Sequence, residues 1–115
     1  MSWWVSLSKD GKLVEVEAFE EGGTYCLGGS NVADLNITYN YGPYFRICLD
    51  KKKGLRWLDG KKARDAIARM ERAVKELGTD KDNNYWKSTP GNAGYALLTL
   101  LKWAKRYPEA IFEVD

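Results

Sequence analysis

The stretch Thr89-Pro90-Gly91-Asn92-Ala93-Gly94-Tyr95 opens the most hydrophobic segment of the chain, and it decides the fold that we predict. Thr89 can cap a helix, and Pro90 suits the first helical position. From there to residue 107 apolar side chains lie on nearly all sides of the predicted helix, which Pro108 ends. A helix of this kind belongs at the centre of the protein, with the rest of the chain packed around it.

The first turn of this helix has almost no side-chain bulk. From Gly91 to Gly94 the free backbone N–H groups are nearly uncovered, and such groups can receive an anion. Lys87 stands just before the cap, and Trp86 and Tyr95 could supply a stacking surface for a planar ligand. The alternative is that the glycines only allow the buried helix to pack closely against a sheet.

A second aromatic segment, residues 39–46, lies at a predicted junction between a strand and a helix, where binding residues are common. Its Tyr41 and Tyr44 could stack on a ligand, and Arg46 could hold a phosphate or carboxylate through two hydrogen bonds. The alternative is that these aromatics form core around a tight turn. Arg46 could equally pair with an acidic residue of the N-terminal half.

The remaining pattern predicts strands followed by helices. Lys9-Asp10-Gly11-Lys12 lies between two apolar-alternating runs, residues 3–8 and 13–18, which is a strong signal for a β-hairpin. Val14 and Val16 share one face of the second run, so we expect the other face to lie in water. Further strands are predicted at 24–27, 35–40 and 111–114, and a turn at 20–23. A short helix over 43–49 and a long helix from an Asp59 cap to Leu77 complete the pattern. The chain is thus predicted as one α+β domain, residues 1–115, with an antiparallel sheet of about four strands and two long helices and one short helix packed on one face.

Composition limits the setting. The chain has 115 residues, and no apolar run approaches the roughly 18 residues that cross a bilayer. The N-terminus has no signal-peptide pattern, so we expect a cytoplasmic protein without membrane contact, in which Cys26 and Cys48 stay reduced.

Charge is divided unevenly along the chain. The net charge of +2 is too small to imply nucleic-acid binding. Residues 1–50 carry three Lys/Arg and seven Asp/Glu, and residues 51–115 carry fifteen and nine, which gives −4 and +6. The lysines at 51–53 and 61–62 are expected on solvated faces. The opposite charge of the two halves could favour head-to-tail or two-fold self-association into a homo-oligomer.

Catalytic groups are scarce. The chain has no histidine, which removes the commonest general base and the usual zinc ligands, and two cysteines cannot form a structural zinc site. We therefore expect no cofactor, no metal and no enzyme activity. The open alternative is a carboxylate-dependent hydrolase that uses Glu15 with Glu17 or Glu20 with Glu21.

Four segments together resemble a set of small, uncharacterised proteins of phages and prophages: Asn36-Ile37-Thr38-Tyr39-Asn40-Tyr41, Leu77-Gly78-Thr79, Tyr85-Trp86 and Thr89-Pro90-Gly91-Asn92-Ala93-Gly94-Tyr95-Ala96-Leu97. The resemblance covers the chain from about residue 27 to residue 114. It implies a setting in a bacterial host cell and brings no established active site. Small phage proteins of this kind often act by binding a host signal or a host protein.

The favoured hypothesis is a non-enzymatic phage-type protein that sequesters an anionic, nucleotide-derived small molecule used as a host-defence signal. The phosphate would lie on the first turn of the central helix and the base on the aromatic rings. The alternatives are an inhibitor that binds a host defence protein, and the hydrolase. The predicted ligand-binding residues are Tyr41, Tyr44, Arg46, Trp86, Lys87, Thr89, Gly91, Asn92, Gly94 and Tyr95.

Overall fold

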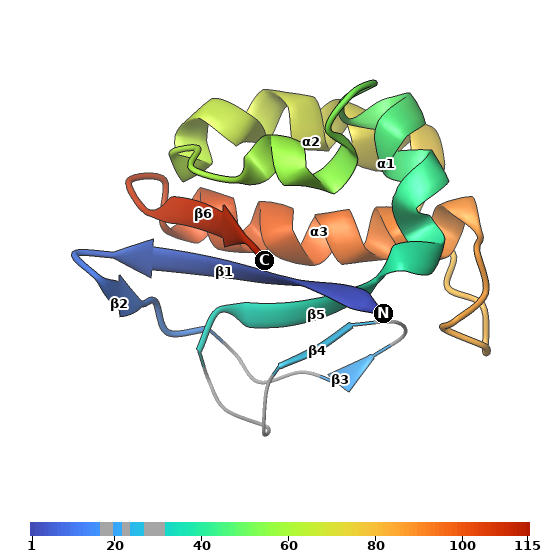
Figure 1. Ribbon diagram of the computed structural model, residues 1–115, viewed down its shortest axis with the longest axis horizontal. Coiled ribbons are helices and arrows are strands. Elements are labelled where there is room, and N and C mark those ends of the chain that lie inside the picture. The colour runs from blue at the N-terminus through green and yellow to red at the C-terminus, as the bar shows by residue number, and fades with distance from the viewer. Residues whose placement is uncertain (17–19, 22–23, 27–31) are drawn as a thin grey trace.

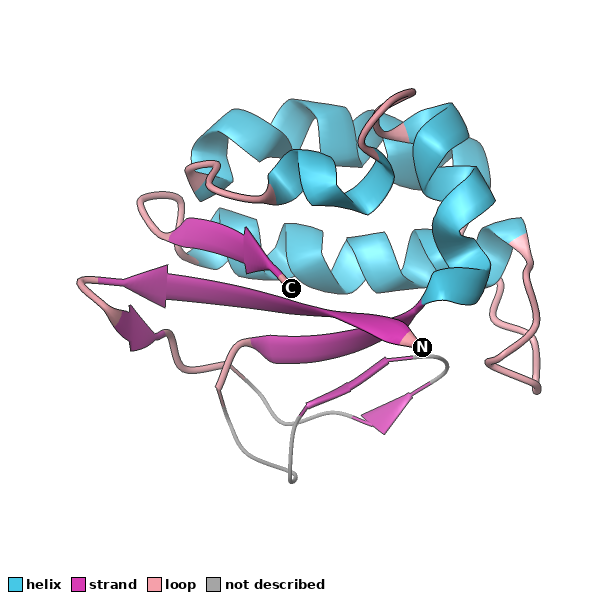
Figure 2. Cartoon of the chain, in the orientation of Figure 1, coloured by secondary structure: helices cyan, strands magenta, loops and turns pink. Residues whose placement is uncertain are grey.

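An antiparallel sheet forms one layer of the protein and the helices cover one of its faces, as Figure 1 shows and as the colouring of Figure 2 makes plain. This computed structural model describes residues 1–16, 20–21, 24–26 and 32–115, with the backbone alone at 20–21 and 24–26. The predicted α+β class is confirmed. The strands are β1 (Ser2–Lys9), β2 (Lys12–Leu13), β3 (Glu20–Glu21), β4 (Thr24–Cys26), β5 (Asp34–Thr38) and β6 (Ile111–Val114), and the α-helices are α1 (Gly42–Cys48), α2 (Ala63–Leu77) and α3 (Pro90–Arg106).

The predicted hairpin joins β1 to β2. Asp10 and Gly11 both have positive φ, 55° and 79°, which is the backbone of a two-residue turn between antiparallel strands. The second strand is shorter than predicted and its expected end at 17–18 lies outside the described residues. Val14 and Val16 are nevertheless buried on one side, as the alternation predicted.

Strand β1 is the centre of the sheet. It pairs with β5 through Ser2–Ser6 and with β6 through Val5–Ser8, and β4 and β3 continue the sheet beyond β5. Among the described residues the sheet has six strands, where about four were predicted. Two of the six have only two residues, and β3 lies where a turn was expected.

Alternate side chains of the three central strands point toward the helices and form the core. They are Val5, Leu7, Leu35, Ile37, Phe112 and Val114. The other face of the sheet carries the polar side chains of the alternation, and no helix covers it in Figure 1.

Strand β5 ends earlier than predicted because its last residue caps the next element. The Thr38 hydroxyl accepts a hydrogen bond from the N–H of Asn40 at 3.2 Å, and the chain turns into a 3₁₀ helix over Tyr39–Tyr41. Helix α1 follows directly, with Pro43 in its first turn as predicted.

The predicted start of the long helix at Asp59 is wrong. Residues Gly54–Leu58 form an unpredicted 3₁₀ helix, and α2 begins at Ala63. The Asp59 carboxylate instead accepts a hydrogen bond from the N–H of Val114 in β6, at 3.0 Å. The Asp59 carboxylate, which the sequence predicted as a helix cap, thus accepts a hydrogen bond from a distant strand. Gly60, with φ of 79°, lies between the 3₁₀ helix and α2.

Helix α3 is the central helix that the sequence predicted. Thr89 caps it by accepting a hydrogen bond from the N–H of Asn92 at 3.1 Å, and eleven of its 17 residues are buried. It packs against α2, which Gly78 ends with φ of 75°. Within the described part of the chain, no helix is long and apolar enough to cross a membrane.

Candidate binding surface

The first turn of α3 is covered by the protein's own backbone. A Cβ atom at Gly91 would lie within 3.0 Å of the Asp80 carbonyl, and one at Gly94 would meet the Gly78 carbonyl as closely. The glycines therefore allow close packing of the helix, which is one of the two alternatives predicted from the sequence. Their neighbour is the chain that follows α2, however, and not the sheet.

Asn92, in the same turn, is fully buried and organises the loop that precedes the helix. Its side-chain oxygen accepts from the N–H of Asp82 at 2.9 Å. Its amide nitrogen donates to the carbonyls of Asn84, at 3.3 Å, and Lys87, at 2.9 Å. The single buried amide of Asn92 thus fixes three points of the loop backbone. Breaking any of these bonds would leave a buried polar group without a partner, which costs free energy.

The loop, residues 82–88, also carries hydrogen bonds of its own. The Asp82 carboxylate accepts from the N–H of Asn84 at 2.8 Å, and the Asn84 side chain accepts from the N–H of Trp86 at 3.1 Å. A further bond joins the N–H of Lys87 to the Asn84 carbonyl at 3.1 Å. Such side-chain turns fix the backbone without help from a ligand.

The second aromatic segment meets this loop from the other side. Asn40 donates its amide to the Trp86 carbonyl at 2.6 Å, the Tyr41 hydroxyl donates to the Tyr85 carbonyl, and the Tyr44 hydroxyl donates to the Ser88 carbonyl at 3.3 Å. The two segments that the sequence singled out are therefore neighbours in space. What joins them is a set of side chains on backbone carbonyls.

Tyr41 is the buried member of this contact. Its ring is fully buried and packs edge-on against Phe45, with ring centroids 6.3 Å apart. Burial, with a smaller contribution from the nearby Tyr85, raises the pKa of its hydroxyl to about 12. The hydroxyl is thus a hydrogen-bond donor to the loop, and the ring is core.

Three aromatic side chains remain exposed on the joined segments: Tyr39 at 37%, Tyr85 at 40% and Trp86 at 49%. We call these three residues the aromatic surface. The rings of Tyr85 and Trp86 lie 4.9 Å apart with an interplanar angle of 39°, and Tyr39 packs edge-on against Trp3 at 4.6 Å. Tyr and Trp are enriched at interfaces because each combines an apolar ring with a polar group that can hydrogen-bond.

Three other residues of the predicted site, Lys87, Tyr95 and Arg46, either contact another side chain or lie away from the aromatic surface. The Lys87 ammonium lies 3.7 Å from the Asp82 carboxylate. Tyr95 is half-buried, with the Lys81 ammonium 4.3 Å from its ring centroid. Arg46 lies on the exposed side of α1, beside an open hollow of about 530 Å³ that Pro43, Arg46, Ile47 and Lys51 line.

The groups that could support catalysis do not form a centre within the described residues. Cys48 is free, and burial and a hydrogen bond to Glu76 raise the pKa of its thiol to about 11, so it is a poor nucleophile near neutral pH. No three His, Cys, Asp or Glu side chains among the described residues come together to hold a metal ion. Glu15 is exposed, and the side chains of Glu17 and of residues 20–21 lie outside the described part.

Four residues that hold the loop, form part of the aromatic surface or pack against it were not among the predicted site residues: Trp3, Tyr39, Asn40 and Asn84. Asn84 ends a polar segment that the sequence predicts as a loop, whereas Asn40 and Tyr39 end the predicted strand 35–40 and Trp3 begins the first predicted strand. A signal was present in the asparagines, because Asn side chains bind backbone groups in turns. Their partners lie up to 46 residues away and could not be read from the chain.

We compared the chain with protein families, with curated proteins and with solved structures, and none of the three comparisons gave a match. The resemblance to small phage proteins therefore stays a prediction.

Proposed function

We propose that the protein is a non-enzymatic binding protein whose aromatic surface docks onto another protein. One observation carries this proposal: Tyr85 and Trp86 are exposed on a loop whose backbone is held from inside by Asn92 and from the side by Asn40 and Tyr41. Buried polar groups are expensive unless they are fully bonded. Here two of them, the Asn92 amide and the Tyr41 hydroxyl, fix a loop that displays two aromatic rings.

The shape of the loop favours a protein partner. Figure 1 shows it standing out from the body of the molecule before the start of α3. Two partly exposed rings on such a loop suit a groove on a partner, and Trp and Tyr are the side chains that most often carry the binding energy of an interface. Because the loop is fixed before binding, little conformational entropy is lost when the partner docks.

The resemblance to small phage proteins suggests a host defence protein as the partner. Binding without turnover would block that partner. This reading needs no catalytic group, which agrees with the protonated state that we infer for Cys48 and with a chain that has no histidine.

The test is affinity capture from a bacterial lysate with three forms of the immobilised protein: the natural chain, Tyr85→Ala with Trp86→Ala, and Ile111→Ala. Ile111 is a matched control because it is an apolar side chain exposed to a similar extent, 36%, on strand β6. We expect at least one protein to be retained by the natural chain and the control and lost with the double variant. The captured protein, once purified, should bind the natural chain directly. We expect Trp86→Ala to weaken this binding by at least about 2 kcal/mol, which is roughly a 30-fold increase in Kd.

A partner retained equally by all three forms would show that binding does not use the aromatic surface. If capture recovers nothing that depends on Tyr85 and Trp86, the proposal is wrong.

An anionic small molecule is the second candidate, and Arg46 with Lys51 is the observation that favours it. Both cations line an open hollow, and among the described side chains neither has a carboxylate within 4.0 Å. The phosphate of a nucleotide would bind there and not on the first turn of α3. Calorimetric titration with cyclic nucleotides and ADP-ribose, on the natural chain and on Arg46→Ala, separates this candidate from the first.

A further inference from the structure

The exposed side of α1 presents an apolar side chain between cations. Ile47 is 76% exposed. Arg46 and Lys51 flank it around the open hollow, and Lys52 and Lys53 follow in the chain, both exposed. We call Arg46, Ile47 and Lys51 the basic patch.

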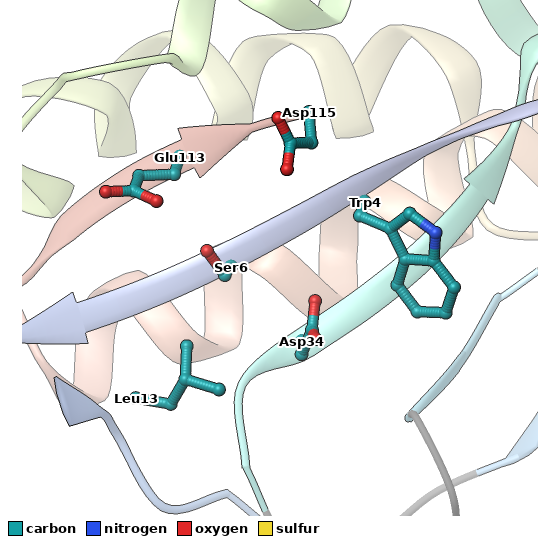
Figure 3. A pocket seen from close by; sticks show the side chains of 6 residues that line it. All are labelled: Trp4, Ser6, Leu13, Asp34, Glu113 and Asp115. Carbon is teal, nitrogen blue, oxygen red and sulfur yellow. The ribbon is translucent and has the colours of Figure 1, made fainter.

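The open face of the sheet carries a hollow of opposite charge. Its volume is about 220 Å³, and Figure 3 shows the side chains that line it, which are Trp4, Ser6, Leu13, Asp34, Glu113 and Asp115. We call these six residues the acidic hollow. It contains three carboxylates together with an indole and an aliphatic side chain.

Strand register explains why the hollow exists. Ser6 of β1 lies directly between Asp34 of β5 and Glu113 of β6, so a small side chain forms the floor between two carboxylates. Trp4 occupies the next outward position of β1 and is bonded through its backbone to Asp115. The period of two in the strands puts all these residues on the face opposite to the core.

The negative charge of the hollow has no counter-charge in the described part of the chain. None of the described Lys or Arg side chains comes within 4.0 Å of the Asp34, Glu113 or Asp115 side-chain carboxylates. Burial, and to a smaller extent the neighbouring Asp115, raise the pKa of Asp34. A cation brought from outside would relieve this repulsion.

We propose that the basic patch of one copy of this chain binds the acidic hollow of a second copy. Ile47 enters the hollow between Trp4 and Leu13, and Arg46 and Lys51 pair with the carboxylates around it. The two surfaces match in charge, and each carries an apolar centre. A second copy is the occupant that the molecule itself points to, because both halves of the contact are on its surface.

The contact is heterologous, since two different patches meet. Each added copy therefore leaves one basic patch and one acidic hollow unused, and the assembly either closes into a ring or grows as a chain. The ion pairs set orientation and rate, while the buried apolar contact of Ile47 adds affinity. Because exposed charges are screened by salt, the assembly should be strongest at low ionic strength.

The experiment is sedimentation velocity over a range of protein concentrations at low and at high salt. We expect the weight-average sedimentation coefficient of the natural chain to rise with concentration at low salt, and the rise to shrink at high salt. Two charge-reversed variants test the assignment: Arg46→Glu with Lys51→Glu, and Glu113→Lys with Asp115→Lys. All four residues are exposed, and circular dichroism will check that each variant folds.

Each variant alone should stay monomeric, because its two patches now carry the same charge. An equimolar mixture of the two should associate again, since each patch of one variant complements a patch of the other. Ile47→Asp should also abolish self-association, because it removes the apolar contact while leaving Arg46 and Lys51 in place.

A natural chain that stays monomeric up to its solubility limit at low salt would overturn the proposal. So would association that survives both charge reversals, because another interface would then be responsible. The variant Tyr85→Ala with Trp86→Ala should self-associate normally. Failure of this inference is therefore distinguishable from failure of the proposed protein partner.

Discussion

The first turn of α3 and the loop that precedes it differ sharply, although the sequence marked them as one site. Gly91, Asn92 and Gly94 are buried and contact the protein's own chain. Tyr85 and Trp86, only a few residues earlier, are exposed to water. The comparison teaches that a helix start rich in small residues can be the support of a binding surface and not the surface itself. Four predictions test this division.

The largest effect is expected where the helix meets the chain after α2. Gly94→Ala and Gly91→Ala each place a Cβ within 3.0 Å of a backbone carbonyl, which cannot move aside as a side chain would. We expect each to lower the free energy of unfolding by about 3 kcal/mol or more, or to prevent folding. Urea denaturation followed by circular dichroism measures this.

Gly42→Ala is the matched control, because Gly42 also starts a helix but a Cβ there would meet only the end of the Arg46 side chain, at 3.4 Å, and the Trp3 ring. It should change stability by less than about 1 kcal/mol. If Gly94→Ala were as mild as this control, the glycine would not be a packing residue, and an anion site at the first turn would become the better explanation.

The next effect concerns the amide that holds the loop. Asn92→Ala removes three hydrogen bonds from a fully buried position, and we expect a loss of about 2–3 kcal/mol in the free energy of unfolding. Hydrogen exchange should speed up at the N–H of Asp82, because that donor would lose its partner. Unchanged exchange at Asp82 would mean that the loop is held by other contacts.

A smaller effect depends on pH. The hydroxyl of Tyr41 has its pKa raised from the ordinary value of 10 to about 12 in the folded protein. The unfolded chain therefore loses this proton first as pH rises, and the stability that the neutral hydroxyl contributes is complete below pH 10 and lost between pH 10 and pH 12.

Tyr41→Phe should lower stability by about 1 kcal/mol at neutral pH, because the Tyr85 carbonyl loses its donor. Above pH 10 the difference between Tyr41→Phe and the natural chain should narrow. Parallel urea titrations at pH 7 and pH 11 measure both, and a difference that grows with pH would contradict the assignment.

The smallest effect on stability is expected for Trp86→Ala, the substitution from which we expect the largest loss of partner binding. Trp86→Ala removes a half-exposed ring, so the free energy of unfolding should change by no more than about 0.5 kcal/mol. Thermal denaturation checks this. A loss comparable to that of Asn92→Ala would place Trp86 with the supporting residues and remove the main reason to regard it as a binding residue.

Local signals in the sequence predicted most elements of the fold. Thr89 and Pro90 start α3, Asp10 and Gly11 form the hairpin turn, and the alternation at 13–16 gives the buried side of the strand. Each of these depends on residues within one turn of one another. Asp59 failed as a predicted cap because its carboxylate has a partner 55 residues away, which local pattern cannot reveal.

The candidate site divides in the same way. The aromatic and glycine content of the sequence singled out the segments 39–46 and 85–95, which the structure places in contact. Which of their residues are buried did not follow: Tyr41 and Tyr44 each look able to stack on a ligand, yet Tyr41 is core and both hydroxyls bind the loop. An aromatic side chain suits a core and a binding surface equally well, so only its neighbours decide.

The sequence by itself determined the α+β class, the central helix with its Thr89 cap, and the shortage of catalytic groups, because these depend on composition and on local periodicity. The tertiary structure alone decided that Gly91 and Gly94 pack on the chain after α2, that Asn40, Tyr41 and Tyr44 hold the loop, and that three carboxylates from separate strands meet around Ser6. These facts depend on contacts between residues far apart in the chain, which form only when the sheet and helices have packed.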